Sequence, residues 1–324
     1  MIPRSLIAPR SIRLTAVVLV LCLGITNPGM ASPRPFTCQV NNSVLIDGPN
    51  SFPQESELLE VFFLNVGQGD AIFLRLGCQT LLIDGGHPEY FTALRDFLMD
   101  RHGSLKVGSL LFTHAHEDHI ANLTTLLRWG GNARRAYGPL ALESSNSQFA
   151  GFMSQLQAKS ILYTRLQQGD CLELGGQSPD RGATPIQSEE QLTQGSALLR
   201  ILRWEDPAQD VNAGSLVIQV EYGLRTLLLT ADITGVAQHH FLKTDGDLLA
   251  SDILKSPHHG VEPMQSDFLD TVSPDLVVVT NSPAATLRFN RQLARRDIPA
   301  VYTGQGILYL ATDGERWYLS QEGE

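Results

Sequence analysis

The stretch Leu110-Leu-Phe-Thr-His-Ala-His-Glu-Asp-His-Ile120 decides the fold of this chain. It begins with apolar residues typical of a buried strand and ends where a helical pattern begins. Side chains two positions apart in an extended segment lie on the same side, so His114 and His116 can bind one ion together. The chain turns after them, which lets Asp118 and His119 face a second ion beside the first. Imidazole and carboxylate groups bind zinc and neighbouring first-row divalent metals, so the stretch predicts a metal site.

An ordinary polar loop between a strand and a helix, with acidic residues that cap the helix, is the alternative interpretation of this cluster. Three histidines and an aspartate within six residues disfavour it. The cluster therefore predicts a metal centre and carries no information on the substrate.

Two later stretches offer further ligands. Asp232 ends an apolar run that begins at Leu227, and a carboxylate at the end of a strand can bridge two cations. The alternative role for Asp232 is to cap the helix that follows, which aspartate commonly does. His258 and His259 follow a second apolar strand and precede a glycine, which favours their presence in the same site.

Patterns of apolar residues over the rest of the chain alternate between strands and helices. In the first half we expect strands at 58–66, 71–76, 80–84 and 107–112, and helices at 90–101 and 148–159. In the second half we expect strands at 196–204, 215–222, 225–230, 250–255, 275–280, 306–311 and 316–320, and helices at 233–243, 265–271 and 286–296. Residues 177–195 are polar and rich in turn-forming residues, which predicts a surface loop. Two such mixed halves predict an α/β (α+β) fold in which two packed sheets carry helices on their outer faces.

The N-terminal segment has the features of a secretory signal peptide. Three arginines precede an apolar run at Leu14–Ile25 that is short for a membrane span, and small residues at Gly29–Ala31 offer a cleavage site. A retained membrane anchor is the alternative. We expect residues 1–31 to be removed from an exported protein, periplasmic or extracellular, with no membrane segment in its mature form. Residues 32–55 are rich in Pro, Ser and Asn, which predicts a loose lead-in to a single domain at 56–324.

Charge and cysteine content restrict the partners. The formal charge is −10, and loss of the three arginines of the N-terminal segment makes it −13. A negative field of this size disfavours tight binding of nucleic acid, although metals and local arginines can oppose it. Cys38, Cys78 and Cys171 would remain after cleavage, so one disulfide can form in an exported protein and at least one thiol has no partner in the chain. The sequence has no C-x-x-C pair, which disfavours thiolate ligands for zinc.

The His-x-His-x-Asp-His pattern at 114–119 is the signature of the metallo-β-lactamase superfamily, which this chain resembles. Five further stretches resemble the C-terminal hydrolase domain of the ComEC-type competence proteins, in that family's order, over residues 58 to about 320. These stretches are Phe63–Ala71, Leu82–Gly86, Ser215–Ile218, Leu228–Asp232 and Leu254–Gly260.

The resemblance implies an αββα sandwich with the metals at one edge of the two sheets. It implies that Asp232 bridges two ions, that His259 binds the second ion and that His258 faces the substrate. We expect one or two ions as the cofactor, zinc in the first place and manganese as the alternative.

The chain departs from the superfamily at one ligand position. Members with a full dinuclear site use another histidine between the first cluster and the bridging aspartate, and this chain has none between His119 and His239. Asn212, shortly before Ser215, is a weak ligand, a hydrogen-bond donor to a ligand or an ordinary turn residue. We therefore expect one ion to be held loosely or to keep a position open to water. The sequence carries no counterpart of the membrane-embedded channel part of ComEC proteins, so no role in DNA uptake is inferred.

Two further aspartates lie near the cluster in the predicted fold. Asp84, which precedes a pair of glycines, is expected to orient a ligand histidine, as carboxylates behind metal ligands do. An ordinary turn residue is the alternative for Asp84, and it is the favoured role for Asp70, which ends a Gly-Gln-Gly turn.

These features favour a secreted metal-dependent hydrolase that uses metal-activated water. Asp118 and Asp232 would hold and orient the water, and His258 would donate a hydrogen bond to the oxyanion or the leaving group. The resemblance to phosphodiesterase-like members favours a phosphoester or phosphodiester substrate, including a nuclease-type reaction. A lactonase or β-lactamase that attacks a carbonyl is the second hypothesis, and the absent histidine makes the β-lactamase less favoured. A metal-binding module without turnover is the third.

Overall fold

The computed structural model describes residues 44–45, 57–139, 147–176, 181–205 and 210–322. The predicted signal peptide, most of the predicted lead-in and Cys38 lie outside these residues. The described part of the lead-in is a short strand, β1 (Val44–Leu45), which pairs in parallel with β17 (Trp317–Glu322) at the edge of a sheet. Among the described residues, no helix is both long enough and apolar enough to span a membrane.

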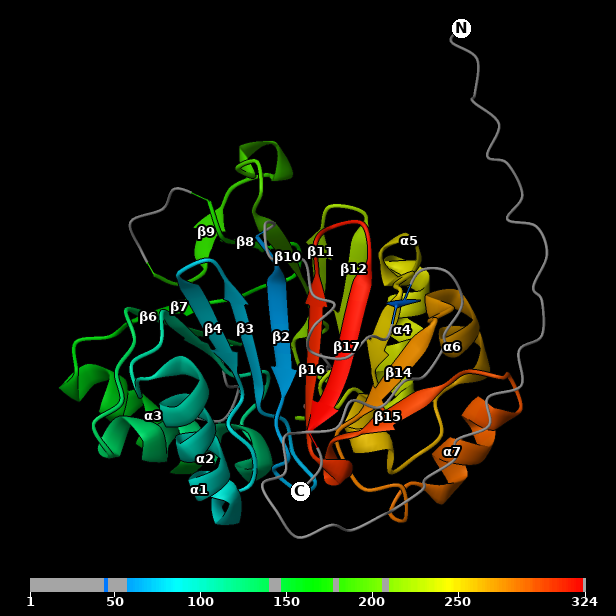
Figure 1. Cartoon of the computed structure of the whole chain (residues 1–324), viewed down its shortest axis with the longest axis horizontal. Helices are drawn as coiled ribbons and strands as arrows, with labels where there is room; N and C mark the ends of the chain where they lie inside the picture. The colour runs from blue at the N-terminus through cyan, green and yellow to red at the C-terminus, as the bar shows by residue number, and fades with distance from the viewer. Residues whose placement is uncertain (1–43, 46–56, 140–146, 177–180, 206–209, 323–324) are drawn as a thin grey trace, which may run out of the picture.

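The first sheet is built mainly from the N-terminal half of the chain (Figure 1). Besides β1 and β17 it contains β2 (Leu59–Phe63), β3 (Ile72–Leu76), β4 (Gln79–Ile83), β5 (Ser109–Leu111), β6 (Arg135–Gly138), β7 (Leu162–Arg165) and β16 (Ile307–Thr312). Their order is β1-β17-β16-β2-β3-β4-β5-β6-β7. Helices α1 (Phe91–Phe97), α2 (Glu117–Arg128) and α3 (Ser147–Ala158) lie on its outer face.

The second sheet is built from the C-terminal half. It contains β8 (Cys171–Leu174), β9 (Thr184–Ile186), β10 (Ala197–Leu202), β11 (Val217–Tyr222), β12 (Arg225–Leu229), β13 (Ile253–Lys255), β14 (Leu276–Val279) and β15 (Ala300–Tyr302). Their order is β15-β14-β13-β12-β11-β10-β8-β9. Its outer face carries α4 (Gly235–Thr244), α5 (Gly246–Leu249), α6 (Ser266–Val272) and α7 (Leu287–Ala294).

Alternation of apolar side chains along the strands explains these layers. In β2, Leu59, Val61 and Phe63 face the other sheet, whereas Phe62 packs with the residues under the helices. Buried apolar side chains thus form one core between the sheets and one between each sheet and its helices. This arrangement confirms the predicted αββα sandwich.

The structure also contains strands that the sequence patterns did not predict, namely β6, β7, β8, β9 and β15. Each spans only three or four residues, which is too short for a clear alternation of polar and apolar side chains. Of these, β9 lies inside the segment that was expected to be a surface loop. The predicted helix at 90–101 is α1 followed by a π-helical turn, Leu98–His102, which ends at Gly103 with φ 74°. Within the part of the chain that the structure describes, Cys78 and Cys171 do not pair with each other.

Strand direction brings the predicted site residues to one edge of the sandwich. The strands β4 and β5 run parallel, as do β12, β13 and β14. Ligands of parallel sheets bind outside the carboxyl ends of the strands. Asp84 follows β4, His114 follows β5, Asp232 follows β12 and the histidine pair follows β13, so the fold gathers segments that are far apart in the sequence.

Candidate metal centre

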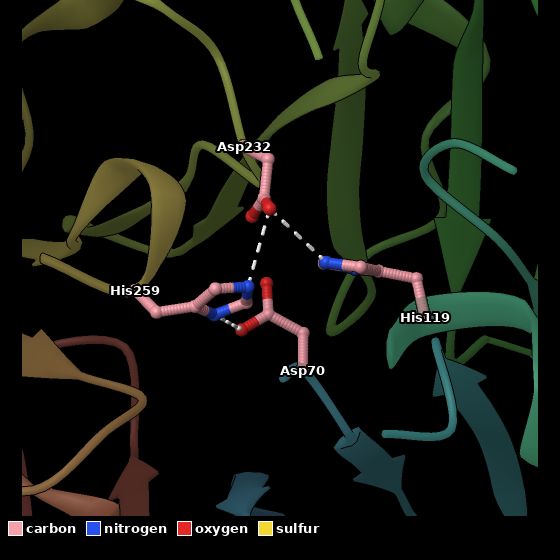
Figure 2. Close-up of side chains that lie close together, drawn as sticks. All are labelled: Asp70, His119, Asp232 and His259. Atoms are coloured by element: carbon pink, nitrogen blue, oxygen red, sulfur yellow. Dashed lines mark ion pairs between the residues drawn. The ribbon is translucent and has the colours of Figure 1, made fainter. Parts of the chain in front are cut away.

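Side chains from both halves of the sandwich point toward one another at this edge. Figure 2 shows that Asp232 and His259, from the second half, face His119 and Asp70, from the first half. His119 lies in the first turn of α2, Asp70 and Asp232 lie in loops next to strands, and His259 lies in a short 3-10 turn, Pro257–Gly260, that follows β13. All four side chains are almost completely buried, and they offer ligand atoms that lie within 4.8 Å of one another.

Two imidazole nitrogens and two carboxylate oxygens lie close together at this edge. His259 Nε2 lies 3.2 Å from Asp232 Oδ2 and 3.5 Å from Asp118 Oδ2, and His119 Nε2 lies 3.4 Å and 4.0 Å from the same two oxygens. Ligands about 2.0–2.1 Å from a tetrahedral ion are about 3.4 Å apart, so the three shorter separations fit a zinc-sized cation, and the 4.0 Å separation is longer. Both Nε2 atoms are buried and have no hydrogen-bond partner among the described residues, which fits atoms that bind a cation. We call Asp118, His119, Asp232 and His259 the inner site.

The other two histidines of the cluster offer a second, smaller set of ligands. His114 Nε2 lies 3.1 Å from His116 Nδ1 and 4.0 Å from Asp232 Oδ2. Asp232 Oδ2 therefore lies between His114 on one side and the inner-site histidines His119 and His259 on the other. From this position one carboxylate can bind two ions. We call His114, His116 and Asp232 the outer site, because His116 is only half-buried.

Asp84 lies behind His119. Its Oδ2 atom is 2.7 Å from His119 Nδ1, and its carboxylate accepts hydrogen bonds from the backbone N–H of Thr113 (2.8 Å) and from the Thr113 hydroxyl (2.7 Å). A proton on Nδ1 that is donated to this carboxylate leaves the lone pair of Nε2 facing the inner site. Asp84 thus occupies the place from which a carboxylate orients a ligand histidine.

Asp70 and Lys255 are part of the centre that the sequence patterns did not single out. Asp70 Oδ1 lies 3.3 Å from His259 Nδ1, which also lies 3.0 Å from the Thr280 hydroxyl, and Asp70 Oδ2 lies 2.5 Å from Lys255 Nζ. Asp70 is 1% exposed and Lys255 is 0% exposed, so Asp70 is not an ordinary turn residue at the surface. The signals in the sequence were the two stretches that carry the resemblance, Phe63–Ala71 and Leu254–Gly260, which contain these residues, and a lysine at the end of an apolar strand, directly before the histidine pair.

His258 reaches the opening of the centre. Its side chain is 31% exposed, and its Nε2 lies 3.9 Å from Asp232 Oδ2. His258 and His259 both have left-handed backbone conformations, with φ 47° and 52°. Such conformations are uncommon for residues other than glycine and cluster at functional sites. Here they let one ring of the pair stay buried while the other meets solvent.

Asn212 lies in a turn just before β11. Its backbone N–H donates to Asp210 Oδ1, and its carbonyl accepts from the N–H of Ser215. The N–H of Leu216 then donates to the Thr113 carbonyl at 3.0 Å, so this turn is tied to the residue before the histidine cluster. The Oδ1 atom of Asn212 is buried and has no hydrogen-bond partner in the described part of the chain.

Burial and charge act in opposite directions on the pKa values of the centre. Burial alone would lower the pKa of His119 and His259, but Asp232 and neighbouring carboxylates raise the pKa of His119 well above its ordinary value and that of His259 to about 10. Burial alone would raise the pKa of Asp232, but the two histidines hold it well below the usual range. Burial keeps the pKa of His114 well below its ordinary value, so this ring is neutral, as a ligand must be. A cation that binds the inner site therefore displaces protons.

The chain matches known proteins in sequence and in fold. The sequence model of the metallo-beta-lactamase superfamily matches residues 64–278, which include every residue of the inner and outer sites. ComE operon protein 3 of Bacillus subtilis (strain 168) is 24% identical over 250 residues, which cover 71% of this chain and 29% of that protein. The chain thus spans less than a third of the length of this relative.

Two solved structures illustrate the similarity in fold. The metallo-beta-lactamase fold protein YhfI from Bacillus subtilis gives a TM-score of 0.44 at 15% identity, over 76% of this chain and 96% of that one. CmlA, a diiron beta-hydroxylase from Streptomyces venezuelae, gives a TM-score of 0.46 at 16% identity, over 80% of this chain and 54% of that one.

Proposed function

The chain belongs to the metallo-beta-lactamase superfamily and is a metal-dependent hydrolase, and from this premise we propose that it hydrolyses small phosphoesters or phosphodiesters. The observation that carries the proposal is the spacing of the inner site, next to an outer site that shares Asp232. Two neighbouring cations suit a phosphoryl group, on whose oxygens negative charge must be stabilised. The partially exposed His258 lies beside Asp232, the residue that the two sites share.

We infer that the inner site binds one ion tightly and that the outer site binds a second ion more weakly. The inner site has four ligand atoms, whereas the outer site has two imidazoles and a shared oxygen. Zinc is the expected metal, with manganese as the alternative, because the donors are imidazoles and carboxylates. When bound, such ions lower the pKa of a coordinated water and neutralise charge on the attacked group.

The side chains of the protein then divide the remaining work. Asp118 is 23% exposed and faces both the inner site and solvent, so it holds and orients the attacking water. Asp232 keeps one oxygen between the two sites. His258 meets solvent at the opening and donates a hydrogen bond to the oxyanion or the leaving group. Asp84 keeps the proton of His119 on Nδ1.

The charge of the chain favours a small substrate. A formal charge of −13 after removal of residues 1–31 repels a long polyanion, so we propose weaker activity on long nucleic acid than on small phosphodiesters. We also propose little activity on β-lactams, because no histidine lies between His119 and His239 to complete the outer site.

A substrate panel under matched metal loading tests the proposal. We expect turnover of bis(4-nitrophenyl) phosphate to exceed that of a lactone and of a β-lactam. Asp118→Ala and Asp232→Ala should remove nearly all of it, whereas Glu173→Gln, a buried carboxylate outside the centre, should leave it unchanged. Dominant lactone or β-lactam turnover would replace the phosphoester assignment by carbonyl hydrolysis. Metal binding without any turnover would favour a binding module.

We also propose that the protein is exported after cleavage behind Ala31. The support is the order of arginines, apolar residues and small residues in the N-terminal segment. Mass spectrometry of the exported form should show a chain that starts at Ser32. A chain that starts at Met1 would instead favour a retained anchor.

A further inference from the structure

A buried lysine lies between the two halves of the metal centre. Lys255 is the last residue of β13 in the second sheet and is 0% exposed. Its Nζ atom lies 2.5 Å from Asp70 Oδ2, in the loop between β2 and β3 of the first sheet. A fully buried ammonium is unfavourable unless it is paired. The contact therefore fixes the end of β13 relative to the loop between β2 and β3.

The Asp70 loop also contacts the histidine cluster on its other side. A Cβ atom on Gly69 would lie 2.8 Å from the backbone carbonyl oxygen of Asp118 and 3.2 Å from the backbone nitrogen of His87. Only glycine permits this approach without a shift of the backbone. The loop is therefore packed between Asp118 in the first half and Lys255 in the second half.

Lys255 also determines how Asp232 is presented. The ammonium donates to the Ala231 carbonyl at 2.9 Å, and that carbonyl also accepts from the backbone N–H of His258 at 3.0 Å. Ala231 has a left-handed backbone (φ 44°), which is uncommon for a residue with a Cβ atom and persists only where its surroundings hold it. Lys255 Nζ also lies 3.8 Å from Asp232 Oδ1, whereas Asp232 Oδ2 is the oxygen that lies beside the imidazoles of His119 and His259.

The partner of Lys255 lies beside the second imidazole of the inner site. Asp70 Oδ1 lies 3.3 Å from His259 Nδ1, a longer contact than the 2.7 Å from Asp84 to His119, and the Thr280 hydroxyl lies 3.0 Å from the same His259 nitrogen. A carboxylate at this position favours the proton on Nδ1 and leaves Nε2 free to bind the ion. Lys255 thus influences two ligands of the inner site: Asp232, through the contact with Ala231, and His259, through Asp70.

We propose that Lys255 and Asp70 form a buried positioning pair that sets the two halves of the metal centre in register and presents Asp232 Oδ2 and His259 Nε2 to the inner site. The inference rests on the metal assignment of the proposed function. Neither residue touches the ion or the substrate in this role. Their effect is measured as the affinity of the centre for its metal.

The test measures zinc affinity by competition with a chromophoric chelator and the melting temperature of the metal-free and zinc-loaded forms. Asp70→Asn and Lys255→Met should each weaken zinc binding about 10- to 100-fold, the range typical of residues behind metal ligands. Lys255→Arg, which keeps the positive charge, should weaken zinc binding less than Lys255→Met does. Glu173→Gln is the control, because it also neutralises a buried carboxylate but lies outside the centre, and it should keep the wild-type affinity.

A double variant separates positioning from stability. Loss of one partner leaves an unpaired buried charge that can prevent folding, whereas Asp70→Asn combined with Lys255→Met removes both charges and should recover the fold. If the pair positions ligands, this double variant folds and still binds zinc weakly. Wild-type zinc affinity in the double variant or in Asp70→Asn would overturn the inference, even with lowered melting temperatures. If the wild-type protein binds no metal, the proposed function fails first.

Discussion

Replacement of Asp84 by asparagine tests how far the carboxylate behind His119 sets metal affinity. Asp84 is completely buried and accepts three hydrogen bonds, two from Thr113 and one from His119 Nδ1. Asparagine has the same shape and is among the residues that tolerate the left-handed backbone found here, so the loop should keep its conformation. The amide oxygen of the asparagine can still accept the hydrogen bond from the Thr113 backbone. The amide N–H group then faces the N–H of His119 Nδ1, and two donors cannot form a hydrogen bond with each other.

The size of the effect follows from this single contact. Relief of the clash requires His119 to carry its proton on Nε2, which removes the lone pair that faces the inner site. A hydrogen bond to a charged group contributes about 1.5–3 kcal/mol. Because about 1.4 kcal/mol corresponds to a factor of ten in affinity, we expect Asp84→Asn to weaken zinc binding about 10- to 100-fold.

Chelator competition on metal-free protein is the assay, with zinc content after dialysis as a second readout. Asp313→Asn is a matched control, because Asp313 also accepts three hydrogen bonds but lies in the turn between β16 and β17. The control should bind zinc as the wild type does. A zinc affinity of Asp84→Asn within about twofold of the control would refute the orientation of His119 by Asp84.

Three further perturbations separate the roles of the remaining site residues. His258→Ala should lower turnover far more than metal content, whereas His259→Ala should lower both. Steady-state rates measure turnover and elemental analysis measures metal content. The reverse result would make His258 the ligand. In the metal-free protein, the pKa of His259 is raised from 6.5 to about 10, so protonation of His259 stabilises the folded state. This stabilisation is complete below pH 6.5 and is lost as the pH rises toward about 10. Urea unfolding should therefore show a loss of about 1.4 kcal/mol per pH unit between pH 7 and 9 that His259→Gln lacks, and equal slopes in the two proteins would contradict the assignment. In a zinc titration, the first equivalent should raise the melting temperature much more than the second, with between one and two ions bound per chain; two equal steps would argue against a tight inner and a weak outer site.

The segments that carry the proposed ligands were predictable because each combines two short-range signals. An apolar run marks the strand, and histidines or an aspartate stand directly after it, as in the stretch from Leu110 to His119. The strands of the core were predictable for the same reason: a strand was expected at 225–230, and β12 spans Arg225–Leu229. The short strands β9 and β15 carry no such pattern, because pairing with a neighbouring strand rather than their own side chains defines them.

Asp70 and Lys255 could not be paired from the sequence. They are 185 positions apart and belong to different sheets, so only the packing of the sandwich brings them together. A lysine at the end of a strand is ordinarily solvent-exposed, and an aspartate after Gly-Gln-Gly is ordinarily a turn residue. Both expectations fail here because the packing of the β2–β3 loop against the end of β13 buries the two charges against each other.

The two sites differ in how they depend on the fold. The inner site takes Asp118 and His119 from the first half of the sandwich and Asp232 and His259 from the second, so an ion bound there joins the halves and stabilises the folded chain by mass action. The outer site takes both imidazoles from the loop before α2 and only the shared Asp232 oxygen from the second half, so loss of its ion leaves the other contacts between the halves in place. A weakly held ion suits the position that exchanges water and substrate. The ion pair of Lys255 and Asp70 crosses the same boundary beneath the inner site, and it can therefore hold the ligands close together before any metal binds.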